Sequence, residues 1–105
     1  MYNQISTSEL RKKIENKEEL LIIDVRTPQE YTQFHLSGSL LIPLSELSQR
    51  LDEISEYKDK DIAIICRSGA RSAVACNILS SYGFSKLHNV YGGLIQWRSS
   101  IDQKQ

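Results

Sequence analysis

Short apolar runs recur along the chain, and stretches with helical spacing separate them. The runs occupy residues 20–23, 40–42 and 62–65, and polar or turn-forming residues bound them. A further short strand is expected over 87–90. A run that is apolar at every position predicts a strand covered on both faces, as in a parallel sheet. With a short strand ending at Ile5, the pattern predicts a three-layer α/β domain in which helices cover both faces of a mainly parallel, five-stranded sheet.

The run at 62–65 constrains function as well as fold, because it ends in a thiol. Cys66 is followed by a turn containing Gly69 and then by Ala70, Val74, Ile78 and Leu79 at the spacing of one helix face, which predicts a helix over 70–82. Cys66 therefore lies at the carboxyl end of a strand and faces a helix N-terminus. In open α/β sheets this edge is the usual ligand site, and the helix N-terminus favours an anion.

The surroundings of Cys66 favour its thiolate form. A free cysteine has a pKa of about 8.5, and a helix N-terminus or nearby arginine commonly lowers it by about two units or more. Arg67 and Arg71 both lie in the turn. We therefore interpret Cys66 as a nucleophile, although a buried structural cysteine beside two surface arginines is the alternative.

Composition limits the remaining possibilities. The length of 105 residues predicts one domain over 1–105 with its core at about 5–98. The 13 basic and 13 acidic side chains balance, which predicts no general affinity for nucleic acid or membrane. The N-terminus lacks the pattern of a leader peptide. Two cysteines ten positions apart fit neither a disulfide framework nor a zinc site. We expect a cytoplasmic, reducing location, with no metal and no cofactor.

Four segments resemble, in order, the signatures of the rhodanese family, whose members move a sulfane sulfur through a cysteine persulfide. They are Asp-Val-Arg-Thr-Pro-Gln-Glu-Tyr at 24–31, a region at 34–43, Cys-x-x-x-x-Arg at 66–71, and Tyr-Gly-Gly-Leu-Ile-Gln-Trp at 91–97. A lone Cys-x-x-x-x-Arg occurs by chance in many chains, whereas the ordered set is specific. The resemblance implies the same α/β fold.

The second of these segments matches only in part. His35, Gly38 and Ile42-Pro43 fit the family pattern, but Phe34, Ser37 and Ser39 stand where Gly, Pro and Ala are usual. The mismatch affects the local conformation near His35 more than the chemistry. We leave His35 out of the catalytic set.

Asp24 and Arg26 follow the strand at 20–23 and so lie at the same sheet edge as Cys66, provided that the strands are parallel. Two interpretations remain open. They form either a structural ion pair with a turn-stabilising aspartate, or a supporting layer behind the reactive cysteine.

The resemblance implies a sulfurtransferase in which the Cys66 thiolate takes the outer sulfur of thiosulfate or another persulfide donor and passes it to a thiophilic acceptor. The backbone N–H groups of Arg67, Ser68, Gly69, Ala70 and Arg71 would cradle the transferred charge. The planar fork of Arg71 would grip a doubly charged donor at two points. Expected partners are small molecules (thiosulfate, cyanide or thiols) or a sulfur-relay protein.

Two other functions compete with this one. Cysteine phosphatases and arsenate reductases resemble the pattern Cys-x-x-x-x-x-Arg, but only four residues separate Cys66 from Arg71. A shorter loop suits a single sulfur atom better than a phosphoryl group. A non-catalytic rhodanese-like binding module is the third possibility, although such a module does not require the thiol.

Local patterns give further expectations. Ser6 with Glu9, and Thr27 with Glu30, form capping boxes at two helix starts. Ser45 is expected to cap a helix whose apolar residues are Leu47, Leu51 and Ile54, and residues 53–61 to form a polar connector.

Nearer the C-terminus, Cys76 and Trp97 are expected to pack in the core rather than to act in chemistry. The tail over 101–105 is expected to fray.

Overall fold

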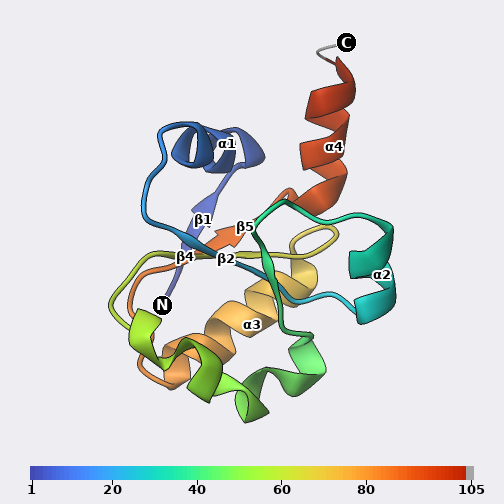
Figure 1. Cartoon of the computed structure of the whole chain (residues 1–105). Coiled ribbons are helices and arrows are strands. Elements are labelled where there is room, and N and C mark those ends of the chain that lie inside the picture. The colour runs from blue at the N-terminus through green and yellow to red at the C-terminus, as the bar shows by residue number, and fades with distance from the viewer. Residues whose placement is uncertain (104–105) are drawn as a thin grey trace.

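The predicted strands form one parallel sheet in the computed structural model, which describes residues 1–103 (Figure 1). The sheet order is β1-β5-β4-β2-β3, and every neighbouring pair is parallel. Its strands are β1 (Asn3–Ile5), β2 (Leu21–Asp24), β3 (Leu40–Leu41), β4 (Ile62–Ile65) and β5 (Leu87–Val90). The predicted α/β class with a parallel sheet is confirmed.

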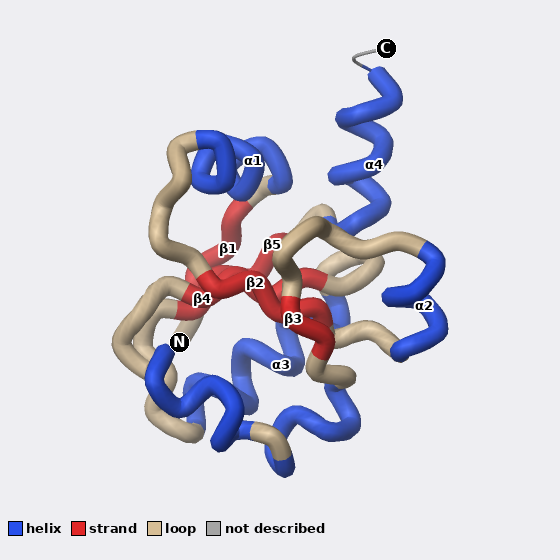
Figure 2. The backbone as a smooth tube through the Cα atoms, viewed as in Figure 1, coloured by secondary structure: helices blue, strands red, loops and turns tan. Residues whose placement is uncertain are grey.

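Helices lie on both sides of this sheet, whose strands run through the middle of the molecule in Figure 2. On one side are α1 (Thr7–Glu15) and α4 (Gly93–Gln103); on the other are α3 (Ala70–Ser81) and the 3-10 segments η1 (Leu44–Gln49) and η2 (Leu51–Tyr57). The short α2 (Pro28–Gln33) follows β2. Successive β4 residues alternate between the two apolar clusters, because side chains of a strand alternate between faces: Ile64 joins one cluster and Ile65 the other.

The strand register brings the site residues to one edge. Asp24 on β2 lies beside Ile65 on β4, and the N–H of Val25 donates to the Ile65 carbonyl at 3.1 Å. Because the strands are parallel, the segments that begin with Val25 and Cys66 leave the sheet at the same edge. Asp24, Arg26 and Cys66 therefore lie at the same edge of the sheet, as expected.

Both predicted capping boxes are present. The Ser6 hydroxyl accepts from the Glu9 N–H at 3.0 Å, and the Glu9 carboxylate accepts from the Ser6 N–H at 2.9 Å. Thr27 and Glu30 make the same reciprocal pair at the start of α2, where Pro28 takes the first helical position. These caps satisfy backbone donors that a helix start leaves free.

The helix expected after Ser45 is wrong in type and in its cap. The chain forms η1 and η2 instead, and η1 begins after Pro43 without a side-chain cap. Ile54 lies at a kink with φ −125° and ψ 15°, and its side chain is fully buried. The connector expected over 53–61 is therefore partly 3-10 helix. Helical spacing of apolar residues does not separate an α-helix from interrupted 3-10 turns that bury the same side chains.

The buried face of α3 also differs from the expectation. Val74 is 49% exposed, and the stripe that faces the sheet consists of Ser72, Ala75, Cys76 and Leu79. Residues three and four apart share a helix face, and on α3 the buried face contains one serine and two small residues, so the positions of the large apolar residues do not identify it.

The C-terminal helix bears out the prediction for Trp97, which is 8% exposed and packs in the core beneath the Arg11 guanidinium, 4.0 Å from the ring centroid. Helix α4 is described as far as Gln103, and the rest of the tail that is expected to fray lies outside the described residues. Within residues 1–103, no helix has the length and apolar character needed to cross a bilayer.

Candidate active site

The Cys66 sulfur lies in a cradle formed by the turn and the first residues of α3. Its Sγ accepts the backbone N–H of Gly69 at 3.0 Å and that of Ser72 at 3.4 Å. The Ser72 hydroxyl lies 3.3 Å from the same sulfur. Cys66 is only 1% exposed, so these protein groups replace water around the sulfur.

Burial and hydrogen bonding act in opposite directions on the Cys66 thiol. Burial is the largest single influence and raises its pKa, but the Ser72 hydroxyl and the N–H groups of Ser72, Gly69 and Ser68 together bring the pKa below its usual value. Hydrogen bonds to a charged form favour that form. The activation expected from the arginines thus comes chiefly from the cradle itself.

Two backbone hydrogen bonds from α4 hold carbonyl groups of the turn that forms the cradle. The N–H of Leu94 donates to the Cys66 carbonyl at 2.9 Å, and that of Ile95 donates to the Arg67 carbonyl at 3.1 Å. The C=O and N–H of a trans peptide point in opposite directions, so turning the Arg67 carbonyl toward α4 turns the Ser68 N–H away from α4, and this N–H is one of the groups that lower the Cys66 pKa.

Glycine is required within the turn. Gly69 has φ +99°, and a Cβ there would collide with the Tyr91 carbonyl. Both the backbone conformation and the close approach of the segment before α4 therefore exclude a side chain.

Arg71 makes its two-point contact with a carboxylate of the protein. Its Nη1 and Nη2 donate to the two oxygens of Glu30 on α2, at 2.7 and 3.0 Å. This hydrogen-bonded pair lowers the pKa of Glu30 to about 2, against the opposing effect of burial. The Arg71 guanidinium, which was expected to face the sulfur donor, is thus occupied by Glu30. The contact ties the loop over residues 66–71, called the active loop below, to α2.

Asp24 and Arg26 form a buried ion pair, as one of the two interpretations predicts. Arg26 Nη2 donates to Asp24 Oδ2 at 2.8 Å, and Nε donates to Oδ1 at 3.0 Å. The same Nη2 also donates to the Phe34 carbonyl at 2.6 Å, at the end of α2. The pair thereby fixes the helix that carries Glu30.

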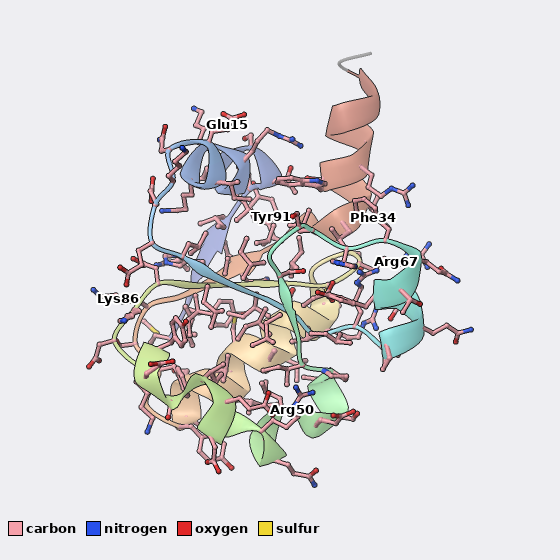
Figure 3. All side chains as sticks on the ribbon, viewed as in Figure 1. Glu15, Phe34, Arg50, Arg67, Lys86 and Tyr91 are labelled. Atoms are coloured by element: carbon pink, nitrogen blue, oxygen red, sulfur yellow. The ribbon has the colours of Figure 1, made fainter. Side chains whose placement is uncertain are left out.

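A cavity of about 580 Å³ adjoins the active loop between α2 and α4. Figure 3 shows Phe34 and Arg67 at this place, and Arg98 lies over the Phe34 ring, 4.7 Å from its centroid. Arg67, Ser68 and Ala70 are exposed. The cavity lining consists of Arg26, Glu30, Gln33, Phe34, Arg67, Leu94, Ile95, Arg98 and Ser99.

Three polar residues of the site escaped the sequence analysis as site residues. The sequence pattern predicts only a capping role for Glu30. It predicts no role for Ser72, because the expected helix is indicated by its apolar residues alone. Asn89 is the third: it is 2% exposed on β5 and accepts a hydrogen bond from the Ser72 hydroxyl. The available signal was a polar residue inside an otherwise buried strand or stripe, since such groups need partners.

Cys76 and His35 lie apart from the cradle. Cys76 is fully buried in the core, and burial raises its pKa to about 12. His35 is exposed, stacks on Tyr31 with ring centroids 3.7 Å apart, and shares a hydrogen bond with the Tyr31 carbonyl. Across the part of the chain that the structure describes, no three His, Cys, Asp or Glu residues gather as a metal site would require.

Comparison with known proteins agrees with this geometry. The family model for the rhodanese-like domain matches residues 6–100. A protein of Allochromatium vinosum named sulfurtransferase is 38% identical over 97 residues, which cover 92% of this chain and 89% of that protein.

Two solved structures show the same fold. A rhodanese-related protein from Thermoplasma volcanium has a TM-score of 0.82 and 32% identity, covering 94% of this chain and 93% of that one. The human single-domain sulfurtransferase TSTD1 has a TM-score of 0.80 at 23% identity, covering 91% and 95%. The chain belongs to the family of rhodanese-like domains.

Proposed function

We propose that this protein is a sulfurtransferase that carries sulfane sulfur as a persulfide on Cys66, with thiosulfate as a competent donor. The observation that carries the proposal is the cradle around Sγ, in which the N–H groups of Gly69 and Ser72 lie 3.0 and 3.4 Å from the sulfur. A nucleophilic thiolate needs such donors, and so does the negative charge that moves through the site.

In the first step, the Cys66 thiolate attacks the outer sulfur of thiosulfate. A new S–S bond forms to Sγ, the S–S bond of thiosulfate breaks, and sulfite leaves with the electron pair. In the second step, a nucleophile such as cyanide attacks the outer sulfur, the persulfide bond breaks, and the Cys66 thiolate is restored. Neither step requires an added oxidant or reductant.

The residues around Cys66 divide this work. Ser68, Gly69 and Ala70 form the turn beside the transferred sulfur, and exposed Arg67 attracts anionic donors. Arg71 holds the loop through Glu30, and the Asp24–Arg26 pair supports that arrangement from behind.

The cavity leaves room for a donor or acceptor larger than thiosulfate, such as an organic thiol or the sulfur-bearing segment of a relay protein. Both cysteines are free, which fits a cytoplasmic, reducing compartment in which a reactive thiol stays available.

The test combines turnover with intact mass. Thiosulfate should add one sulfur to the wild type and to Cys76→Ser, and none to Cys66→Ser, and only the first two should convert thiosulfate and cyanide to thiocyanate. Sulfur retained on Cys66→Ser would contradict the assignment. Absence of transfer with every sulfur donor would favour a binding module, and hydrolysis of an aryl phosphate that depends on Cys66 would favour a phosphatase.

A further inference from the structure

We propose that Asn89 is a positioning residue that competes with the Cys66 thiolate for the single proton of the Ser72 hydroxyl, and so holds the resting cysteine partly in its thiol form. The inference deepens the proposed function, since it concerns the same sulfur. Its test measures the alkylation of Cys66 and not sulfur transfer. The inference can therefore fail while the proposed function holds, and the proposed function can fail while the inference holds.

A chain of hydrogen bonds runs from the sulfur to the first strand. The Cys66 thiol donates to Ser72 Oγ at 3.3 Å, and the Ser72 hydroxyl donates to Asn89 Oδ1. Asn89 Nδ2 then donates to Gln4 Oε1 at 3.0 Å and to the Gly69 carbonyl at 3.4 Å. With a neutral thiol, every donor along the chain has an acceptor.

Ionisation of Cys66 breaks this order. A thiolate only accepts, so the Ser72 hydroxyl must turn toward the sulfur or leave its lone pairs facing a negative charge. Once it turns, Asn89 Oδ1 loses its donor. A hydroxyl has one proton to give, and the two acceptors therefore compete for it.

Rotation of the Asn89 amide does not remove the conflict. A half-turn would bring Nδ2 toward Ser72, but it would also bring Oδ1 toward the Gly69 backbone carbonyl, which can only accept. The exposed Gln4 amide can turn to suit either orientation. Asn89 is 2% exposed, so bulk water does not supply the missing donor. The Gly69 carbonyl therefore favours the orientation in which Asn89 Oδ1 faces Ser72, and that orientation favours the thiol.

Removal of the amide side chain leaves its other partners satisfied. The Gly69 carbonyl also accepts the Ala73 N–H at 3.2 Å, and Gln4 is exposed to solvent. An apolar side chain of similar size at position 89 would therefore free the Ser72 hydroxyl for the sulfur without leaving a buried polar group unpaired.

The charged and titratable groups on the elements around Cys66 are the same in all the variants below. They are Arg67 and Arg71 on the loop and α3, Cys76 on α3, Asp24 and Arg26 at the end of β2, Glu30 on α2, His88 on β5, Tyr91 before α4, and Arg98 on α4. Their influence on the thiol cancels when variants at positions 72 and 89 are compared.

The experiment follows the alkylation rate of Cys66 by iodoacetamide against pH, with the adduct located by mass spectrometry. The pH at which the alkylation rate is half its maximum is the midpoint of this curve. Asn89→Leu should lower that midpoint by about half a pH unit to one pH unit, the size expected for one hydrogen bond gained by the thiolate. Ser72→Ala should raise it. Adding Asn89→Leu to Ser72→Ala should leave the midpoint unchanged, because no shared proton remains.

Three results would overturn the proposal: no shift in Asn89→Leu, an upward shift, or an equal downward shift with and without Ser72. Asn3→Leu is the matched control on β1, because its amide lies outside the chain and pairs with His88; its midpoint should match the wild type. If circular dichroism shows that Asn89→Leu does not fold, Asn89→Asp replaces it. A carboxylate is a stronger acceptor, so it should raise the midpoint more with Ser72 present than absent, and equal rises would refute the competition.

Discussion

The pair between Glu30 and Arg71 gives a stability prediction that can be worked out from the structure. Glu30→Gln removes the charge but keeps the capping box with Thr27, since glutamine also serves at this position. The Glu30 pKa falls from 4.5 to about 2, which at about 1.4 kcal/mol per unit sets a ceiling of roughly 3–4 kcal/mol. The side chains are 30% and 35% exposed, so solvent screening reduces the expected loss in unfolding free energy to about 1–2 kcal/mol.

The pH dependence has a definite sign. Because folding depresses the Glu30 pKa, the stabilisation is fully present above about pH 4.5 and is lost as the pH falls toward 2. The difference between wild type and Glu30→Gln should therefore shrink by about half or more by pH 3.

Urea unfolding at pH 7 and pH 3 measures this difference, with the fluorescence of Trp97 as the probe, since it is the only tryptophan in the sequence. Glu9→Gln is the matched control, because Glu9 occupies the same position of a capping box and, among the residues that the structure describes, no arginine pairs with its carboxylate. Equal losses in Glu9→Gln and Glu30→Gln, or a Glu30→Gln loss unchanged at pH 3, would refute the argument.

Two further predictions concern the loop. Arg71→Lys keeps the charge but loses one of two contacts to Glu30, and we expect kcat/KM with thiosulfate to fall about ten- to a hundredfold; a value within twofold of the wild type would contradict the anchoring role. Gly69→Ala should abolish transfer and lower the unfolding free energy by more than Gly83→Ala does, because both glycines have positive φ but only at Gly69 would a Cβ meet the backbone. Equal losses measured by urea unfolding would show that φ alone matters.

The sequence predicted the features that neighbouring residues encode. The strand before Cys66, the turn at Gly69 and both capping boxes depend on residues close together in the chain, and the structure has all of them. Parallel strands then determine that Asp24 and Cys66 share an edge.

Contacts across the fold could not be predicted in the same way. Glu30 and Arg71 are 41 positions apart, and no local pattern indicates that the Arg71 fork meets a carboxylate of the protein instead of a donor. Likewise, the role of Ser72 depends on which face of α3 meets the sheet, and that face is decided by packing rather than by the largest apolar residues.

The docking of α4 on the active loop has a consequence for how activity arises during synthesis. The loop that carries Cys66 is made well before Leu94 and Ile95, whose N–H groups hold its carbonyls. A nascent chain that has just exposed Cys66 on the ribosome thus lacks the groups that orient the cradle. Its thiol should therefore react like an ordinary cysteine until α4 emerges and docks.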